Sequence, residues 1–252
     1  MIQAFSCFDQ FEIIQVLKFH PFGNFDISVT NSTIFLILPA LYIVFLYETN
    51  IKNGLLVPGR YQSLLEIFYE IWHSLIKDNI GQDGYRFFPF ILTLGIFIIT
   101  INLFGLIPYT FTPTTHLAMT FTLSFSIFIA VNFIGFSKYP TTFISFLMPS
   151  GAPLGMAPFL VLIEFCSHSA KALTLGLRLA ANMIGGHLLL NIISGFAWQM
   201  LTCGIFTITL GAAIPIAIGL FVCVLEIGVA CIQAYVFCLL TVIYLNEGLH
   251  LH

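Results

Sequence analysis

Residues 173–190 read LTLGLRLAANMIGGHLLL, which places one guanidinium, Arg178, in an apolar run whose other ionisable group is His187. An arginine does not lose its proton at any ordinary pH. A charge at membrane depth costs about 2.5–3.5 kcal/mol on insertion scales, so such a residue marks a functional site by default. The stretch therefore predicts a membrane helix that keeps a fixed positive charge for a function.

The composition of the whole chain is that of a membrane protein. Of its 252 residues, 59% are hydrophobic and 8% are charged, whereas an ordinary soluble domain carries about 25% charged residues. The six cysteines form no CxxC pair, so we interpret them as small buried hydrophobic residues. Nor is there a basic patch for nucleic acid. We predict an all-α integral membrane protein without metal, cofactor or nucleic-acid partner.

Charge-free stretches near the roughly 20 residues needed to cross a hydrocarbon core divide the chain, which we treat as one membrane domain, 1–252. They predict membrane spans at 87–109 and 115–137, and a shorter apolar run at 33–47, flanked by polar residues, predicts a first span at 31–49. A connector rich in proline and glycine follows at 139–155. Residues 60–79 carry apolar side chains at helical spacing and charged side chains opposite them. This pattern predicts an amphipathic helix that lies at the membrane interface.

The last two apolar tracts, 156–198 and 204–248, are too long for ordinary spans. As a single helix, each would measure more than about 60 Å, twice the hydrocarbon thickness. A fold-back would need a polar break that can be satisfied at the surface, and the middle of the tracts offers only Gly185-Gly186 and Pro215. We therefore favour a C-terminal hairpin of two long, strongly tilted membrane helices over two fold-back hairpins.

Positive charge indicates the orientation of the chain. Four of the eight Lys and Arg residues lie between the first and second predicted spans: Lys52, Arg60, Lys77 and Arg86. Because positive loops stay on the cytoplasmic side or its organellar equivalent, the matrix, this segment is expected inside. The N-terminus is then expected outside.

Polar residues in the first long tract share one broad helical face at about 100° per residue. They are Glu164, His168, Lys171, Arg178 and Asn182. His187 lies nine residues beyond Arg178, about 13 Å further along the axis and half a turn round. It is therefore expected to face a different compartment from Arg178.

The last tract carries Glu226 and Gln233 on one face, with Glu247 within about 60° of Glu226. If the two long helices are antiparallel, His187 and Glu226 lie toward the outer turn. Glu164 and Glu247 then lie toward the inner surface. Histidine and glutamate can relay protons when their environment brings titration near the working pH, whereas arginine cannot. The tracts thus predict two titratable pairs on opposite sides of a fixed charge.

Structural roles for these residues remain open at this point. A purely structural Arg178 would pair with Glu164, although 14 residues of helix span about 21 Å. His187 could be a packing histidine, and the Asn182 and Gln233 amides could join helices. His168 and Lys171 could reach the inner interface with their polar ends.

At this level the chain resembles a known family. LGLRLAANMIGGHLLL and LEIGVACIQAYVFCLLTVIYLNE resemble the C-terminal signature of subunit a of the F-type ATP synthase, whose mitochondrial form is also called ATPase subunit 6. FFPFILTLGIFIITINLFGLIPYTFT and APFLVLIEF resemble the same family, so the resemblance covers nearly the whole chain. The order of histidine before acid, His187 before Glu226, resembles the mitochondrial form.

The resemblance implies a proton-conducting stator subunit of the membrane sector, which is not catalytic alone. Its expected place is the mitochondrial inner membrane, with several spans and the N-terminus toward the intermembrane space. Its expected partners are a ring of c subunits, peripheral-stalk and other membrane-sector subunits, lipid, and protons as the transported ion.

The same resemblance implies a role for each polar position. Arg178 would face the ring carboxylate and separate two offset half-channels, with Gln233 and Asn182 beside it. His187 and Glu226 would line the half-channel from the intermembrane space. Glu164 and Glu247 would line the matrix side, where His168 belongs to the same polar stripe.

Two rival classes of membrane protein fit the residues less well. A secondary transporter, or a proton-pumping subunit of a respiratory complex, usually shows internal repeats and helices broken at the midplane, and no repeat is visible in the sequence. A membrane enzyme or haem protein needs histidines on facing helices or a nucleophile and base. Here His168 and His187 belong to one predicted helix.

Overall fold

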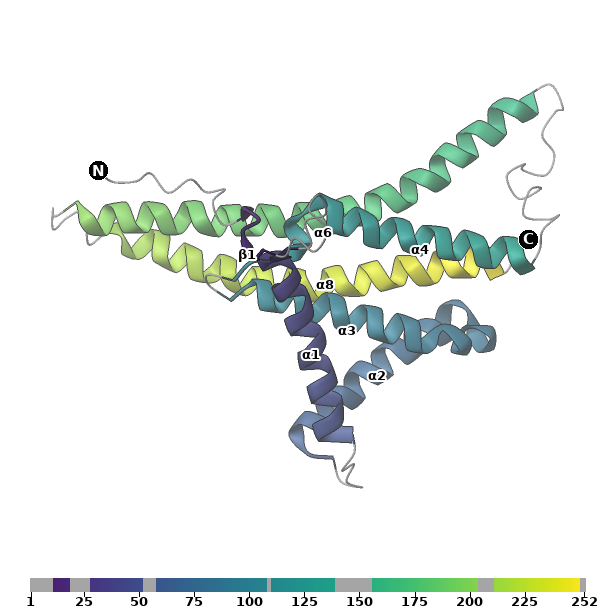
Figure 1. The fold of residues 1–252 in the computed structure, drawn as a ribbon, viewed down its shortest axis with the longest axis horizontal. Helices are drawn as coiled ribbons and strands as arrows, with labels where there is room; N and C mark the ends of the chain where they lie inside the picture. Colours follow the sequence, from purple (N-terminus) through teal and green to yellow (C-terminus); the bar gives the residue numbers. More distant parts are fainter. Residues whose placement is uncertain are drawn as a thin grey trace. The chain divides into compact units, whose positions relative to one another are not determined.

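The computed structural model describes residues 11–18, 28–51, 58–107, 110–138, 156–203 and 211–249, and helices dominate them (Figure 1). Within this part, five helical segments are long and apolar enough to cross a membrane. They are Asn31–Thr49, Gly81–Gly105, Leu117–Lys138, Phe159–Thr202 and Ala213–Leu249. The prediction of an all-α protein with several membrane spans is confirmed. The predicted connector at 139–155 lies outside the described residues.

The long helices are α1 (Asn31–Ile51), α2 (Arg60–Asn79), α3 (Phe88–Gly105), α4 (Leu117–Lys138), α6 (Ala157–Thr202) and α8 (Ala213–Leu249). Two short 3₁₀ turns, η2 (Gly81–Phe87) and η3 (Pro113–Thr115), flank α3 and α4. A short antiparallel pair, β1 (Gln15–Leu17) and β2 (Val29–Thr30), precedes α1 and was not predicted.

Helices α6 and α8 are each continuous, with 46 and 37 residues. The Gly185-Gly186 pair stays helical inside α6, and Pro215 lies in the first turn of α8. A proline costs little in a first turn, where its missing N–H would have no helical partner. A fold-back in the middle of α6 would have left backbone groups unsatisfied among apolar side chains, and continuous helix avoids that cost.

The chain divides into two compact units, each with its own core. The first unit comprises residues 1–48, 96–116 and 180–234, and the second comprises 49–95, 117–179 and 235–252. Helices α3, α6 and α8 each contribute one segment to both units.

In the first unit, α1 packs on the end of α3, where the rings of Tyr42 and Phe104 meet edge to face at 5.3 Å. Its α6 and α8 segments run antiparallel, because Asn182 bonds to Gln233 while a Cβ at Gly219 would touch Ile193. Side chains that follow one another along α6 thus meet residues in reverse order along α8.

In the second unit, α2 buries one stripe and leaves the other face open. Trp72, Leu75 and Ile76 are buried, and the ring of Tyr69 meets Phe88 at the start of α3 edge to face at 4.8 Å. Leu64 remains about half exposed on α2. The helix is amphipathic, and its charged residues keep it out of the set that could cross a membrane.

Candidate functional site

Six of the eight predicted site residues, all except Arg178 and Glu164, gather in two clusters, one in each unit. The first cluster is defined by Asn182 and His187 of α6, Glu226 and Gln233 of α8, and Thr112 of the segment between α3 and α4. The second cluster is defined by His168 and Lys171 of α6, Glu247 of α8, and Asn132 of α4.

Glu226 is the acid of the first cluster, and it is deeply buried. Its side chain is 4% exposed, and neither carboxylate oxygen has a hydrogen-bond partner among the described residues. The carboxylate lies directly against Gly186, where an added Cβ would overlap Oε1. Gly186 thus makes room for Glu226 beside His187. A buried carboxylate without partners is uncommon in proteins, which makes Glu226 a candidate functional residue.

His187 is bonded to a residue from another part of the chain. Its Nε2 lies 3.1 Å from the hydroxyl oxygen of Thr112, a residue 75 positions earlier in the sequence. The Thr112 hydroxyl also lies 3.3 Å from the carbonyl oxygen of Gly105, to which it donates. His187 therefore does join two parts of the chain, through a hydrogen bond to a buried hydroxyl.

The two amides of the first cluster join α6 to α8. Asn182 donates its Nδ2 to Oε1 of Gln233 at 2.8 Å. Gln233 is 3% exposed, and its Nε2 has no hydrogen-bond partner within the described ranges. One side of this amide therefore links the helices, and its other side presents an unused donor.

The second cluster contains an ion pair. Lys171 Nζ lies 3.1 and 3.0 Å from the two carboxylate oxygens of Glu247, and the two side chains are 34% and 32% exposed. Beside this pair, His168 Nε2 lies 2.9 Å from Oδ1 of Asn132. Glu164 is half-buried, and it forms no hydrogen bond to another residue in the described part of the chain.

Arg178 lies on the exposed face of α6. Its guanidinium makes no hydrogen bond or ion pair with any residue that the structure describes, including Glu164. The structural pairing of these two residues is therefore not observed. The five N–H donors of this fixed positive charge are therefore unused within the described residues.

Three polar residues of these surroundings were missed at the sequence level: Asn102, Thr112 and Asn132. Asn102 is fully buried and accepts a hydrogen bond from the Thr114 hydroxyl at 3.1 Å. Each asparagine lies in an otherwise charge-free span, where a polar side chain is costly unless it is bonded. That cost is the signal that could have identified them. Thr112 carries no comparable signal, because hydroxyls are common in loops.

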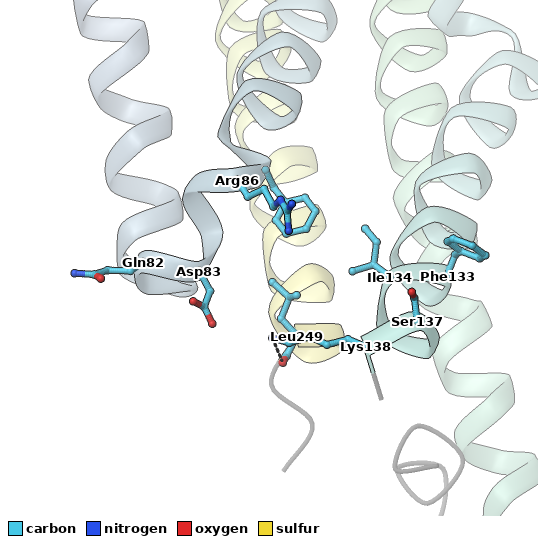
Figure 2. Close-up of a pocket in the computed structure, with 9 residues that line it drawn as sticks. Gln82, Asp83, Arg86, Phe133, Ile134, Ser137, Lys138 and Leu249 are labelled. Atoms are coloured by element: carbon cyan, nitrogen blue, oxygen red, sulfur yellow. Dashed lines mark hydrogen bonds between the residues drawn. The ribbon is translucent and has the colours of Figure 1, made fainter. Parts of the chain in front are cut away.

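A pocket of about 730 Å³ lies in the second unit, between η2 and the C-terminal ends of α4 and α8 (Figure 2). Arg86 and Lys138 line it, and Lys138 donates to the carbonyl oxygen of Leu249 at 3.4 Å. None of the predicted site residues lines this pocket. Among the described residues, no three His, Cys, Asp or Glu side chains are arranged to hold a metal ion.

Comparison with known proteins places these clusters in a family context. The sequence model of the family described as ATP synthase A chain matches residues 30–246. The chain is 46% identical over 255 residues to ATP synthase subunit a-1 of Arabidopsis thaliana, which covers 99% of this chain and 66% of that protein.

Other relatives match over nearly their full length. ATP synthase subunit a of Brassica napus is 45% identical over 255 residues, which is 99% of this chain and 98% of that protein. ATP synthase subunit a of Neurospora crassa is 41% identical over 251 residues, which is 99% and 96% of the two chains.

Proposed function

Because this chain belongs to the ATP synthase A chain family, we propose that it couples proton flow to rotation of a ring of c subunits through two offset half-channels separated by Arg178. Membership of the family supports the general role of the chain, that of a proton-translocating subunit of the membrane sector. The proposed location is the mitochondrial inner membrane. Peripheral-stalk and other membrane-sector subunits would be its neighbours in the complex.

The distribution of positive charge supports assigning each cluster to one side of the membrane. The second unit contains Arg60, Lys77, Arg86 and Lys138. Positive residues stay on the matrix side, so the second cluster would belong to the matrix half-channel. The first cluster would then belong to the half-channel from the intermembrane space, the side on which the N-terminus is also proposed to lie.

In this mechanism, His187 and Glu226 pass a proton from the intermembrane space to a carboxylate of the ring. The neutralised carboxylate can enter lipid at far lower cost than a charged one. After nearly a full rotation, the carboxylate releases its proton toward Glu247 and the matrix. Each charge that crosses supplies about 2.3 kcal/mol per 100 mV of membrane potential, so several crossings are needed for one ATP.

The single observation that carries the proposal is the state of Arg178, which is exposed and has no hydrogen-bond or ion-pair partner in the described part of the chain. A facing carboxylate of another subunit would supply that partner. The fixed charge would favour the ionised form of the carboxylate as it arrives. A guanidinium that never deprotonates would also prevent protons from passing directly between the half-channels.

Disulfide crosslinking tests the proposed contact with the ring. Single cysteines are placed along residues 174–186 of the assembled complex, after the native cysteines have been replaced by serine or alanine. Each is paired with a cysteine that flanks the ring carboxylate. We expect crosslinks at exposed positions such as Leu177 and Ala181, and none at the buried Leu175 and Leu179.

Crosslinks with this helical period, centred on Arg178, would support the stator role. If no position crosslinks in a complex that is folded and membrane-inserted, Arg178 faces something other than the ring. The transporter alternative would then become the better account.

A further inference from the structure

The segment that joins α3 to α4 is packed into the first unit and brings one hydroxyl to His187. Phe111, Thr112 and Thr115 are all buried, and the Phe111 ring stacks on His116 at 5.2 Å. The Thr115 hydroxyl donates to the backbone carbonyl of Thr112 at 2.7 Å. Thr112 is itself 4% exposed, so its bond to His187 lies inside the packed structure.

The direction of the bond follows from the number of hydrogens on the hydroxyl. Thr112 has one O–H, which it donates to the carbonyl oxygen of Gly105. A side chain at position 105 would prevent this, because a Cβ there would lie 2.6 Å from the Thr112 hydroxyl oxygen. With its O–H on the Gly105 carbonyl, the hydroxyl acts as an acceptor toward Nε2 of His187. Nε2 carries a hydrogen in this arrangement, and Nδ1 of the neutral ring is left without one.

We propose that Thr112 is a positioning residue of the outer proton path, which holds His187 in the tautomer whose Nδ1 takes up and releases the transported proton. This inference rests on the proposed function. In the transfer, Nδ1 of the neutral ring binds a proton and becomes N–H, and the same proton then leaves Nδ1 for a carboxylate oxygen. No electrons are exchanged.

The acceptor available in the same unit is Glu226 of α8. Its carboxylate lies against Gly186, the residue that precedes His187. Among the described residues of the segment between α3 and α4, the titratable group is His116, whose ring is stacked on Phe111. From α1, the ring of Phe35 approaches Phe111 at 6.4 Å and adds apolar surface. Thr112 itself bears no charge, so it acts through His187.

The test uses the assembled complex in sealed inner-membrane vesicles, with Thr112→Val, Thr112→Ser and Thr115→Val. ATP synthesis is measured against the proton concentration on the outer side, at fixed inner pH and fixed membrane potential. Protonated His187 has two N–H donors, and valine removes the acceptor of one of them. Because hydrogen bonds to charged groups are the stronger ones, we expect T112V to raise the half-saturating proton concentration about tenfold.

T112S keeps the hydroxyl, so it should restore the wild-type value. T115V is the matched control, because it removes a buried hydroxyl of the same segment that bonds only to backbone. It should leave the half-saturating concentration unchanged. If T112V prevents assembly, Thr112→Ala takes its place. Alanine also removes the hydroxyl, and it adds no methyl group where the hydroxyl was. A value within twofold of wild type for the assembled variant, or an equal shift in T115V, would overturn the inference.

His187→Ala in the same assay separates this inference from the proposed function. If H187A slows proton-driven synthesis and T112V does not change the proton dependence, the path through His187 stands and the role of Thr112 is wrong. If H187A has no effect, the assignment of the first cluster to the proton path is itself wrong.

Discussion

The two clusters contain similar residues, but they differ in the burial of the glutamate and in whether a cation is bonded to it. Each has a histidine on α6 bonded to a neutral side chain, and a glutamate on α8. Glu247 is held by the fixed cation of Lys171 and is 32% exposed, whereas Glu226 is 4% exposed and has no bonded partner in the described part of the chain. Glu247 thus has a cation bonded to it, and Glu226 has none among the described residues.

This difference fits the proposed proton path, in which protons enter through the first cluster and leave through the second. In the proposed mechanism, Glu226 must alternate between protonated and charged forms to hand protons to the ring. Glu247 must instead draw protons away without retaining them. A partnered, solvent-accessible carboxylate meets the second need, and an unpartnered buried one meets the first.

The largest expected effect comes from removing the charge that would keep the two clusters apart. Arg178→Ala should lower coupled ATP synthesis below detection, because nothing else would favour the ionised ring carboxylate or block leakage. ATP synthesis by vesicles is the measurement, with native gels to check that the complex assembles. Arg178→Lys is the matched control, and it should retain part of the activity since lysine keeps the charge but can deprotonate. Synthesis at the normal rate in R178A would contradict the separation of the clusters.

The next effect compares the two acids directly. Glu226→Gln should slow passive proton conduction through the membrane sector by roughly a hundredfold, in the range of a lost acid–base group. Glu247→Gln should slow it far less, because Lys171 and solvent remain at the exposed site. Equal losses in the two variants would mean that burial and pairing do not distinguish the clusters.

A smaller effect is expected from a pair of neighbouring glycines. Gly186→Ala would push a methyl group into the Glu226 carboxylate, whereas a Cβ at Gly185 would meet nothing within 4 Å. We expect G186A to slow proton conduction about tenfold, as a misplacement near the chemistry does. G185A should leave conduction unchanged and stabilise the helix slightly. If both variants conduct protons at the same rate, the function of Glu226 does not depend on the space that Gly186 leaves for its carboxylate.

The smallest effect concerns the ion pair of the second cluster. Lys171→Glu and Glu247→Lys each place like charges together, and the double reversal restores an opposite pair. Since the pair is about one-third exposed, its contribution to stability should be about 1 kcal/mol or less. Thermal unfolding of the four complexes in a double-mutant cycle measures it. A coupling energy indistinguishable from zero would show that the pair does not hold the second cluster.

Most of the fold could be predicted because its signals are local. A run of apolar residues long enough to span a bilayer must satisfy its backbone internally, so it must be helical. The same reasoning identified α2 from its periodicity and treated the two last tracts as single long helices. The β1–β2 pair was missed because three- and two-residue strands carry no periodicity to detect.

The sequence by itself determined which residues are out of place in an apolar environment, and it is the ground for predicting that Arg178, His187, Glu226 and Glu247 belong to a functional site. Only the tertiary structure decided which polar groups meet. Lys171 reaches Glu247 across 76 positions, and Thr112 reaches His187 across 75. Hydropathy and helical period describe each helix alone, whereas these contacts depend on how distant helices and loops pack against one another.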